Sequence, residues 1–152
     1  MQDAGIYARH VPALDRVVEL GVAQGRVVGV SFPSESSADA AADHPLLDRL
    51  EDVLGEGGED LADVEVALTV PTDRRAVLEA VRSIPRGETV DVATLARLAG
   101  LDGEDESDRA TVEAALRGNP IPLFVPDHRV EAPGATPDEV VRRLRALESG
   151  AD

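Results

Sequence analysis

Residues 119–130, NPIPLFVPDHRV, combine stiff, apolar and reactive side chains in one short run. Three prolines restrict the backbone, since each ring holds φ at about −65°. The apolar stretch from Leu123 to Val125 leads into Pro126, and an aspartate, a histidine and an arginine follow directly at 127–129. An apolar scaffold that delivers a carboxylate, an imidazole and a guanidinium to one place predicts a functional site.

The sequence around this run predicts short helices. DVATLARLAG (91–100) and RATVEAALRG (109–118) each show helical spacing and end at a glycine. They are joined by the acidic stretch LDGEDESD, which makes them a helix-turn-helix candidate, although most such pairs only pack together.

Two further helices flank this pair. One is predicted to start at a cap residue, Thr72, and to stop at Pro85 and Gly87. The other, over 137–148, is preceded by Thr136 as N-cap, with proline at its first position and glutamate at its third. The predicted inner faces of the two helices are Val77, Leu78, Val81 and Ile84, and Val140, Val141, Leu144 and Leu147.

The first half of the chain predicts strands and one helix. Segments 4–11, 16–23 and 26–32 alternate as strands do, and Gln24-Gly25 makes the last two a hairpin candidate. A polar loop at 34–43 is followed by a helix at 44–58, with apolar residues at 46, 47, 50, 53 and 54. A short strand, VEVALTV at 64–70, is expected to close the region.

The chain is strongly acidic. The 152 residues carry a net charge of −15, and all 15 basic residues are arginines. This composition resembles that of proteins from salt-loving archaea, in which an acidic surface keeps the chain soluble. At molar salt the Debye length is only about 3 Å, so the negative charge does not by itself exclude nucleic acid as a partner.

Several kinds of site are excluded or disfavoured by composition. Because the chain has no cysteine, it has no disulfide, no thiolate metal ligand and no thiol nucleophile. His10 and His44 have no carboxylate at ligand spacing, and the adjacent Asp127 and His128 would chelate one ion poorly, so we expect no metal or other cofactor. The sequence shows neither an apolar run long enough for a membrane nor a secretory signal, so a cytoplasmic location is the expectation.

The order of motifs carries a resemblance. IPRGETVDVATLA (84–96), a helix, RGNPIPLFVPDHRV (117–130) and a last helix ending in LRALE (144–148) together resemble the O6-alkylguanine-DNA alkyltransferase family and its non-catalytic relatives, the alkyltransferase-like proteins. The similarity covers most of the second half. The first half resembles the small sheet-plus-helix domain that precedes it in the family.

The resemblance implies roles for individual residues. The family pattern is PCHRV, in which the cysteine takes the alkyl group from a flipped-out guanine. A histidine serves as base through a water, and a glutamate orients it; His128 and Glu148 match these two residues. Asn119 matches the residue that joins the recognition helix to the active-site strand, and Arg129 matches the arginine after the histidine.

Other positions depart from the family pattern. Asp127 stands at the alkyl-acceptor position, and Val92 stands where a tyrosine helps to rotate the nucleotide. The loop that walls the base pocket beside Pro122 and Pro126 is shortened to EAPGATPDE (131–139). The arginine wedge that replaces the flipped base matches Arg109 only with an offset of one residue. Arg109, Arg117, Asn119 and Arg129 are the expected DNA contacts, the arginines through phosphates.

Three uses of Asp127 remain open from the sequence. A carboxylate is a poor acceptor for a methyl group, so an ester is disfavoured. It can activate water as a general base, which would mean a different reaction. Alternatively it pairs or hydrogen-bonds with His128 or Arg129 and locks the turn, since a buried carboxylate needs a partner.

The sequence thus predicts an α+β protein with two parts. Residues 1–70 are expected to form a small antiparallel sheet with a helix, and residues 71–152 a helical, winged-helix-like DNA-binding domain. The predicted function is that of a catalytically silent, monomeric family member. It would bind double-stranded DNA through the minor groove, at O6-alkylguanine in one version, and mark it for repair proteins. The alternatives are an interaction module without DNA binding, and a hydrolytic enzyme with Asp127 as base.

Overall fold

The computed structural model describes residues 5–33, 41, 43–56, 61 and 64–148. It confirms the α+β fold class, with a three-stranded antiparallel sheet of order β1-β2-β3 followed by helices. The elements in chain order are β1 (Gly5–Val11), β2 (Arg16–Ala23), β3 (Arg26–Ser31), α1 (Pro45–Glu56), α2 (Thr72–Val81), α3 (Val92–Leu98), α4 (Glu106–Arg117), the 3₁₀ turn η1 (Asp127–Arg129) and α5 (Asp138–Glu148).

The predicted hairpin forms around a tight two-residue turn. Gln24 and Gly25 both have positive φ, at 54° and 77°. Such angles belong to the turn type whose twist matches the twist of paired strands. The predicted strands therefore agree with β2 and β3 to within one residue.

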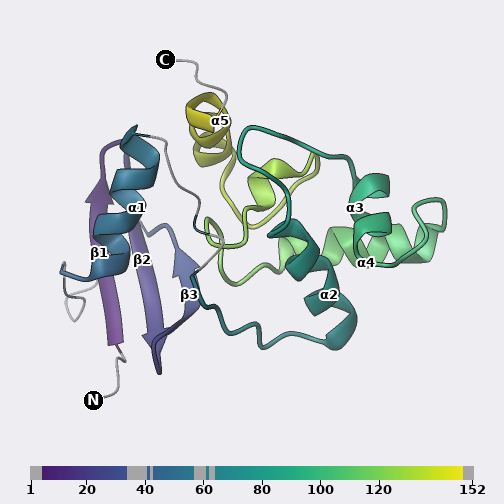
Figure 1. The fold of residues 1–152 in the computed structure, drawn as a ribbon, viewed down its shortest axis with the longest axis horizontal. Coiled ribbons are helices and arrows are strands. Elements are labelled where there is room, and N and C mark those ends of the chain that lie inside the picture. Colours follow the sequence, from purple (N-terminus) through teal and green to yellow (C-terminus); the bar gives the residue numbers. More distant parts are fainter. Residues whose placement is uncertain (1–4, 34–40, 42, 57–60, 62–63, 149–152) are drawn as a thin grey trace.

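One face of the sheet is covered by α1 (Figure 1). Leu47 and Leu50 of the helix and Val18 and Leu20 of β2 are all fully buried. At the edge of this interface Arg9 donates hydrogen bonds of 2.9 Å to Asp48 and to Glu51. The spacing predicted for this helix is confirmed over its described part, while the predicted residues 57 and 58 lie outside the described residues.

The predicted strand at 64–70 is wrong. The segment makes a single bridge, between Val27 and Val66, where Val27 donates to Glu65 at 3.1 Å and Ala67 donates to Val27 at 2.9 Å. The carbonyl of Val64 accepts instead from the Arg82 guanidinium at 2.7 Å. A side chain thus takes a backbone acceptor that a longer strand ladder would use.

The helices α2, α3 and α4 pack on one another beyond the sheet (Figure 1). Leu78, Leu95 and Leu116 place one fully buried side chain from each helix in this core. The fourth helix begins at Glu106, three residues earlier than predicted, and Asp105 caps it by accepting from the Ser107 amide at 3.3 Å. Acidic residues favour the positive end of a helix, which explains why this part of the acidic stretch is helical.

Two predicted helix caps are wrong. Thr72 is the first residue of α2, and Pro71 occupies the cap position without a side-chain hydrogen bond. Thr136 precedes α5 by two residues and its side chain turns inward, being only 3% exposed. Its hydroxyl has no hydrogen-bond partner among the described residues.

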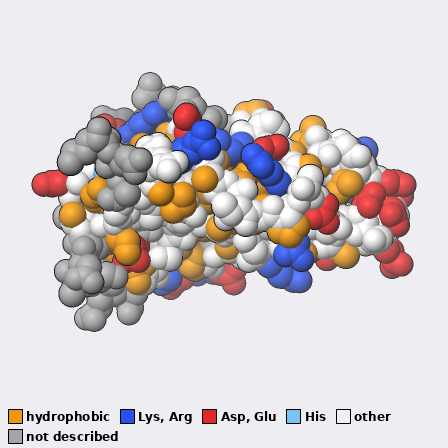
Figure 2. Space-filling view, turned by 90° about the horizontal axis from the view of Figure 1, so that it is seen from below, with side chains coloured by type: hydrophobic (Ala, Val, Ile, Leu, Met, Phe, Trp, Pro, Cys, Tyr) orange, Lys and Arg blue, Asp and Glu red, His pale blue; other side chains and the backbone are white. Residues whose placement is uncertain are grey.

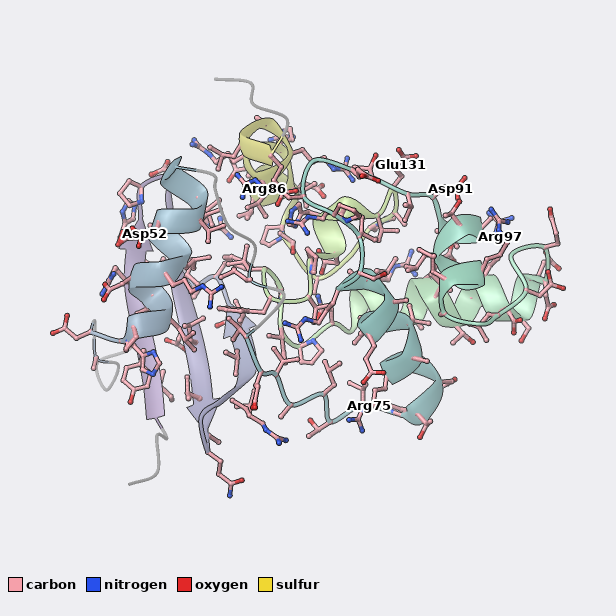
Figure 3. The ribbon with its side chains drawn as sticks, viewed as in Figure 1. Asp52, Arg75, Arg86, Asp91, Arg97 and Glu131 are labelled. Carbon is pink, nitrogen blue, oxygen red and sulfur yellow. The ribbon has the colours of Figure 1, made fainter. Side chains whose placement is uncertain are left out.

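Arginines connect the sheet half to the helical half. Arg82 donates to the carbonyls of Leu61 and Phe124 at 3.2 and 3.1 Å. Arg86, labelled in Figure 3 between α1 and the helical half, donates to the Val53 carbonyl at 3.4 Å. The domain boundary near residue 70 remains a prediction. Within the described part of the chain, no helix combines the length and apolar character that a membrane span needs.

Candidate functional site

The run NPIPLFVPDHRV at residues 119–130 lies largely in the interior. All ten residues from 121 to 130 are buried, and Asn119 is 4% exposed. The Asn119 side chain organises the turn, because its Oδ1 accepts from the Ile121 amide at 3.0 Å and its Nδ2 donates to the Val125 carbonyl at 3.0 Å. Leu123 has a positive φ of 77° in this turn, a conformation that is uncommon for a residue with a side chain.

Asp127 opens η1, and its carboxylate is enclosed at 2% exposure. Its Oδ2 accepts from Asn119 Nδ2 at 2.9 Å and from the Ala135 amide at 3.1 Å. Its Oδ1 has no hydrogen-bond partner among the described residues. The expected partners His128 and Arg129 are therefore wrong for Asp127, because both side chains turn toward Glu148 instead.

His128 and Glu148 lie in direct contact. Nε2 of His128 is 2.8 Å from Oε2 of Glu148, and both side chains are enclosed. An ionised carboxylate can only accept, so Nε2 carries the hydrogen. The structure thus brings together the two residues that the family resemblance paired, although their catalytic role stays a prediction.

The Arg129 guanidinium also binds Glu148 and compensates its negative charge. Its Nε donates to Glu148 Oε1 at 3.0 Å and its Nη2 donates to Oε2 at 2.8 Å. This two-bond geometry is the strongest arrangement between an arginine and a carboxylate. Burial raises the pKa of Glu148, but the hydrogen bonds and positive charge supplied by His128 and Arg129 lower it further, to about 2.

The upstream motif IPRGE also contributes to this cluster. The Ile84 carbonyl accepts from Arg129 Nη1 at 2.9 Å. Gly87 has a φ of 87°, and a Cβ at this position would lie 3.1 Å from the Glu148 carbonyl oxygen. The motif therefore positions Arg129 and the end of α5. The Arg129 guanidinium is occupied in the interior, so it is poorly placed to contact phosphate.

Arg145 of α5 is a supporting residue for this site. Its Nε donates to the His128 carbonyl at 2.9 Å and its Nη2 to the Val130 carbonyl at 3.0 Å. These bonds fix η1 against α5. The spacing of Arg145 and Glu148, three residues apart on one helix face, was the available signal.

The predicted pocket residues are packed into the core. Pro122 and Pro126 are buried, and Val92, at the start of α3, is 7% exposed. Val92 follows the bridge between Val90 and Val130, in which the Val90 amide donates to the Arg129 carbonyl at 3.0 Å. The role of these residues in holding a base stays a prediction.

The predicted phosphate ligands of the helix-turn-helix lie on the surface. Arg109 and Arg117 are both exposed on α4, and Arg97 projects from α3 (Figure 3). Glu106 and Glu113 flank Arg109 around a surface hollow of about 220 Å³. Acidic side chains also gather at the end of the molecule that holds the α3–α4 turn (Figure 2), so Arg109, near the start of α4, lies in a locally acidic field.

Comparison with known proteins agrees with this geometry. Residues 72–142 match the family model described as 6-O-methylguanine DNA methyltransferase, DNA binding domain. No curated protein sequence matches the chain.

Solved structures of similar fold cover nearly the whole chain. A variant of the Mycobacterium tuberculosis O6-methylguanine methyltransferase has a TM-score of 0.79 at 22% identity, over 99% of this chain and 95% of its own. The M. tuberculosis OGT in complex with DNA has a TM-score of 0.73 at 24% identity, over 95% of this chain and 92% of its own. The O6-methylguanine-DNA methyltransferase of Pyrococcus kodakaraensis has a TM-score of 0.68 at 22% identity, over 95% of this chain and 99% of its own. This chain therefore has the fold of the O6-methylguanine methyltransferases, and residues 72–142 match the model of their DNA-binding domain.

Proposed function

We propose that this protein is an alkyltransferase-like member of that family, which binds double-stranded DNA and transfers no alkyl group. The observation that carries the proposal is the exposure of Arg109 and Arg117 on α4, inside the segment that matches the DNA-binding domain model. A solved relative of the same fold was crystallised in complex with DNA. The family resemblance of the sequence motifs supports the further proposal that α4 enters the minor groove.

Catalytic silence follows from the chemistry of the acceptor position. A thiolate is the family's acceptor, and the chain has no cysteine. Asp127 is a hard, resonance-stabilised nucleophile. One of its oxygens already accepts two hydrogen bonds, which reduces its nucleophilicity further. The enclosed carboxylate also argues against the hydrolytic alternative, because a general base must reach the water that it activates.

The second candidate is a protein-interaction module without DNA binding. It is favoured by the acidic side chains around α4, where Glu106 and Glu113 flank Arg109. Carboxylates beside a phosphate contact oppose binding at low salt. Since the Debye length falls to about 3 Å at molar salt, the same surface tolerates DNA in a salt-rich cell. The two candidates therefore differ in what they predict for duplex binding in concentrated KCl.

The decisive measurement is fluorescence anisotropy with a labelled duplex in a KCl series up to molar concentration. We expect saturable binding, weakened about threefold to tenfold by Arg109→Ala or Arg117→Ala, because phosphate contacts supply much of such affinity. Arg26→Ala is the matched control, since Arg26 is exposed on β3 in the other half. Absence of binding at every salt concentration, or equal losses in all three variants, would favour the interaction module.

Intact mass measurement tests catalytic silence separately. After incubation with a duplex that contains O6-methylguanine, the mass of the protein should be unchanged and the lesion should remain in the DNA. A stable added methyl group, or loss of the lesion without an adduct, would contradict the proposal.

A further inference from the structure

The loop between Arg129 and α5 is seated on the Asp127 carboxylate. The Ala135 amide donates to Asp127 Oδ2 at 3.1 Å. A methyl group built on Gly134 would lie 2.8 Å from Asp127 Cγ and 3.1 Å from both Cβ and Oδ2. Real Cβ atoms do not approach a neighbour as closely as 2.8 Å, so only a glycine fits here without movement.

Further hydrogen bonds fix both ends of this loop. At its start, the Glu131 amide donates to the Val90 carbonyl at 2.8 Å and Thr89 Oγ1 donates to Glu131 Oε2 at 3.0 Å. Toward its end, the Ala135 amide also donates to the Leu116 carbonyl of α4 at 3.0 Å. The loop is thereby connected to the segment before α3, to the last turn of α4 and to Asp127.

One carboxylate oxygen joins the loop to the turn after α4. Asp127 Oδ2 accepts from Asn119 Nδ2 as well as from Ala135. An alcohol or thiol at position 127 carries a single heteroatom on a shorter arm, whereas the carboxylate places its oxygens one atom further from the backbone. The aspartate therefore reaches both donors and fills space beneath the loop.

Access to position 127 is closed in this arrangement. Asp127 is 2% exposed, His128 is 3% exposed, and the loop backbone at Gly134 lies directly against the carboxylate. An extrahelical base would have to occupy space next to residue 127, where an enzyme that acts on a base holds it in a pocket. In this protein the Asp127 side chain and the loop at Gly134 fill the space that such a base would need.

We propose that Asp127 and Gly134 form a latch that excludes an extrahelical base, so that this protein binds duplex DNA without regard to O6 alkylation. The proposal rests on the proposed duplex-binding function. It assigns Asp127 a specificity-determining role in place of a catalytic one. The protein's own loop fills the space beside residue 127, and the ligand is duplex DNA with all its bases stacked.

The first test compares two duplexes in the high-salt binding assay. They are identical except for guanine or O6-methylguanine at one position, with 2-aminopurine beside it as a fluorescent reporter of unstacking. We expect affinities equal to within about twofold and no rise in 2-aminopurine fluorescence on binding. A preference of about tenfold or more for the lesion, or a fluorescence rise that saturates with binding, would overturn the proposal.

The same assay with Asp127→Ala assigns the role to the side chain. The variant should fold, because Asn119 Nδ2 still has the Val125 carbonyl and the Ala135 amide still has the Leu116 carbonyl. If Asp127 excludes the base, the ratio of lesion to unmodified affinity should rise by about threefold or more. An unchanged ratio would show that the exclusion does not depend on Asp127.

A stability cycle tests the latch without DNA. Gly134→Ala should lower the thermal midpoint of the parent, because its methyl group collides with the carboxylate. In the Asp127→Ala background the loss should shrink by at least half, since the 2.8 Å contact and the contact with Oδ2 are then removed. Pro133→Ala, an exposed change in the same loop, serves as control and should give no such coupling.

The outcomes separate this inference from the function on which it rests. If neither duplex binds, the proposed function fails, and the cycle alone decides whether the latch exists. Equal costs of Gly134→Ala in both backgrounds would show that the loop does not rest on Asp127, and would overturn the latch. Equal duplex affinities together with a coupled cycle support both parts.

Discussion

The site contains two acidic residues, Asp127 and Glu148, whose enclosed carboxylates have contrasting surroundings. Glu148 receives a two-bond arginine contact and a histidine, so its negative charge is met by a positive charge at 2.8 Å. Asp127 receives only the neutral N–H groups of Asn119 and Ala135, and one of its oxygens has no partner among the described residues. The Glu148 cluster is therefore a structural assembly in its own right. It lies beside position 127 in a chain that has no cysteine.

The largest expected effect comes from breaking the Glu148 cluster. Glu148→Ala leaves the Arg129 guanidinium buried without its anion, and loss of one partner of a buried pair costs about 3–5 kcal/mol. We expect this loss in the free energy of unfolding, measured by urea titration in concentrated KCl. Both side chains are at most 7% exposed, so solvent screening reduces the effect little.

Glu139→Ala is the control for this variant. Glu139 lies on the same helix, but its side chain is 70% exposed and 3.8 Å from Arg16. Surface pairs contribute about 0–1 kcal/mol, so the control should lose no more than that. Equal losses in the two variants would show that α5 helicity, and not the buried cluster, determines the effect.

Acid should weaken the same cluster in a defined pH window. The pKa of Glu148 is lowered from 4.5 to about 2, so the unfolded chain takes up its proton first as the pH falls. The stabilisation is therefore present above pH 4.5 and is lost between that pH and about 2. Its size is about 3 kcal/mol, since each unit of pKa shift corresponds to about 1.4 kcal/mol.

Comparison with Glu148→Gln isolates this contribution from the other carboxylates. The difference in unfolding free energy between parent and variant should decrease as the pH is lowered from 5 to 2 at constant ionic strength. A difference that stays constant with pH would show that protonation of Glu148 does not control the cluster.

Local patterns in the sequence were enough for most of the fold. The Gln24-Gly25 turn and the period of the flanking strands predicted the hairpin, because both signals depend on neighbouring residues. The segment 64–70 also alternated like a strand, yet its carbonyl at Val64 is bound by Arg82, which follows 18 residues later. Competition from a distant side chain leaves no trace in a local pattern.

In the candidate site, too, some contacts could be predicted from the sequence and others could not. The contact between His128 and Glu148 was anticipated from motif order, which reflects ancestry and not local physics. The partners of Asp127 were predicted wrongly, because adjacency in sequence suggested His128 and Arg129. In η1 successive side chains point in different directions, so the neighbours of Asp127 in space come from residues 119 and 135.

The smallest expected effect concerns the reactivity of a thiol placed at position 127, next in sequence to the Glu148 cluster. Asp127→Cys introduces a thiol into a chain that has none, so any thiol chemistry reports on this position alone. Because Nε2 donates to Glu148, Nδ1 is the ring nitrogen of His128 that is left to accept a proton, and it has no partner among the described residues. If a water bridges Nδ1 to the thiol, this acceptor favours the thiolate.

We therefore expect the thiol of Asp127→Cys to react with iodoacetamide at a lower pH than the same thiol in Asp127→Cys with His128→Gln. The absolute rate should stay low, since the loop at Gly134 covers this position, and it should rise when Pro133→Gly loosens the loop. Methyl transfer from O6-methylguanine DNA should be slow in every variant, because the thiol needs a base in the pocket as well as a proton acceptor. Matching pH profiles with and without His128 would show that the cluster supports the fold only. Rapid stoichiometric methyl transfer by Asp127→Cys would show that the aspartate alone separates this chain from an active alkyltransferase.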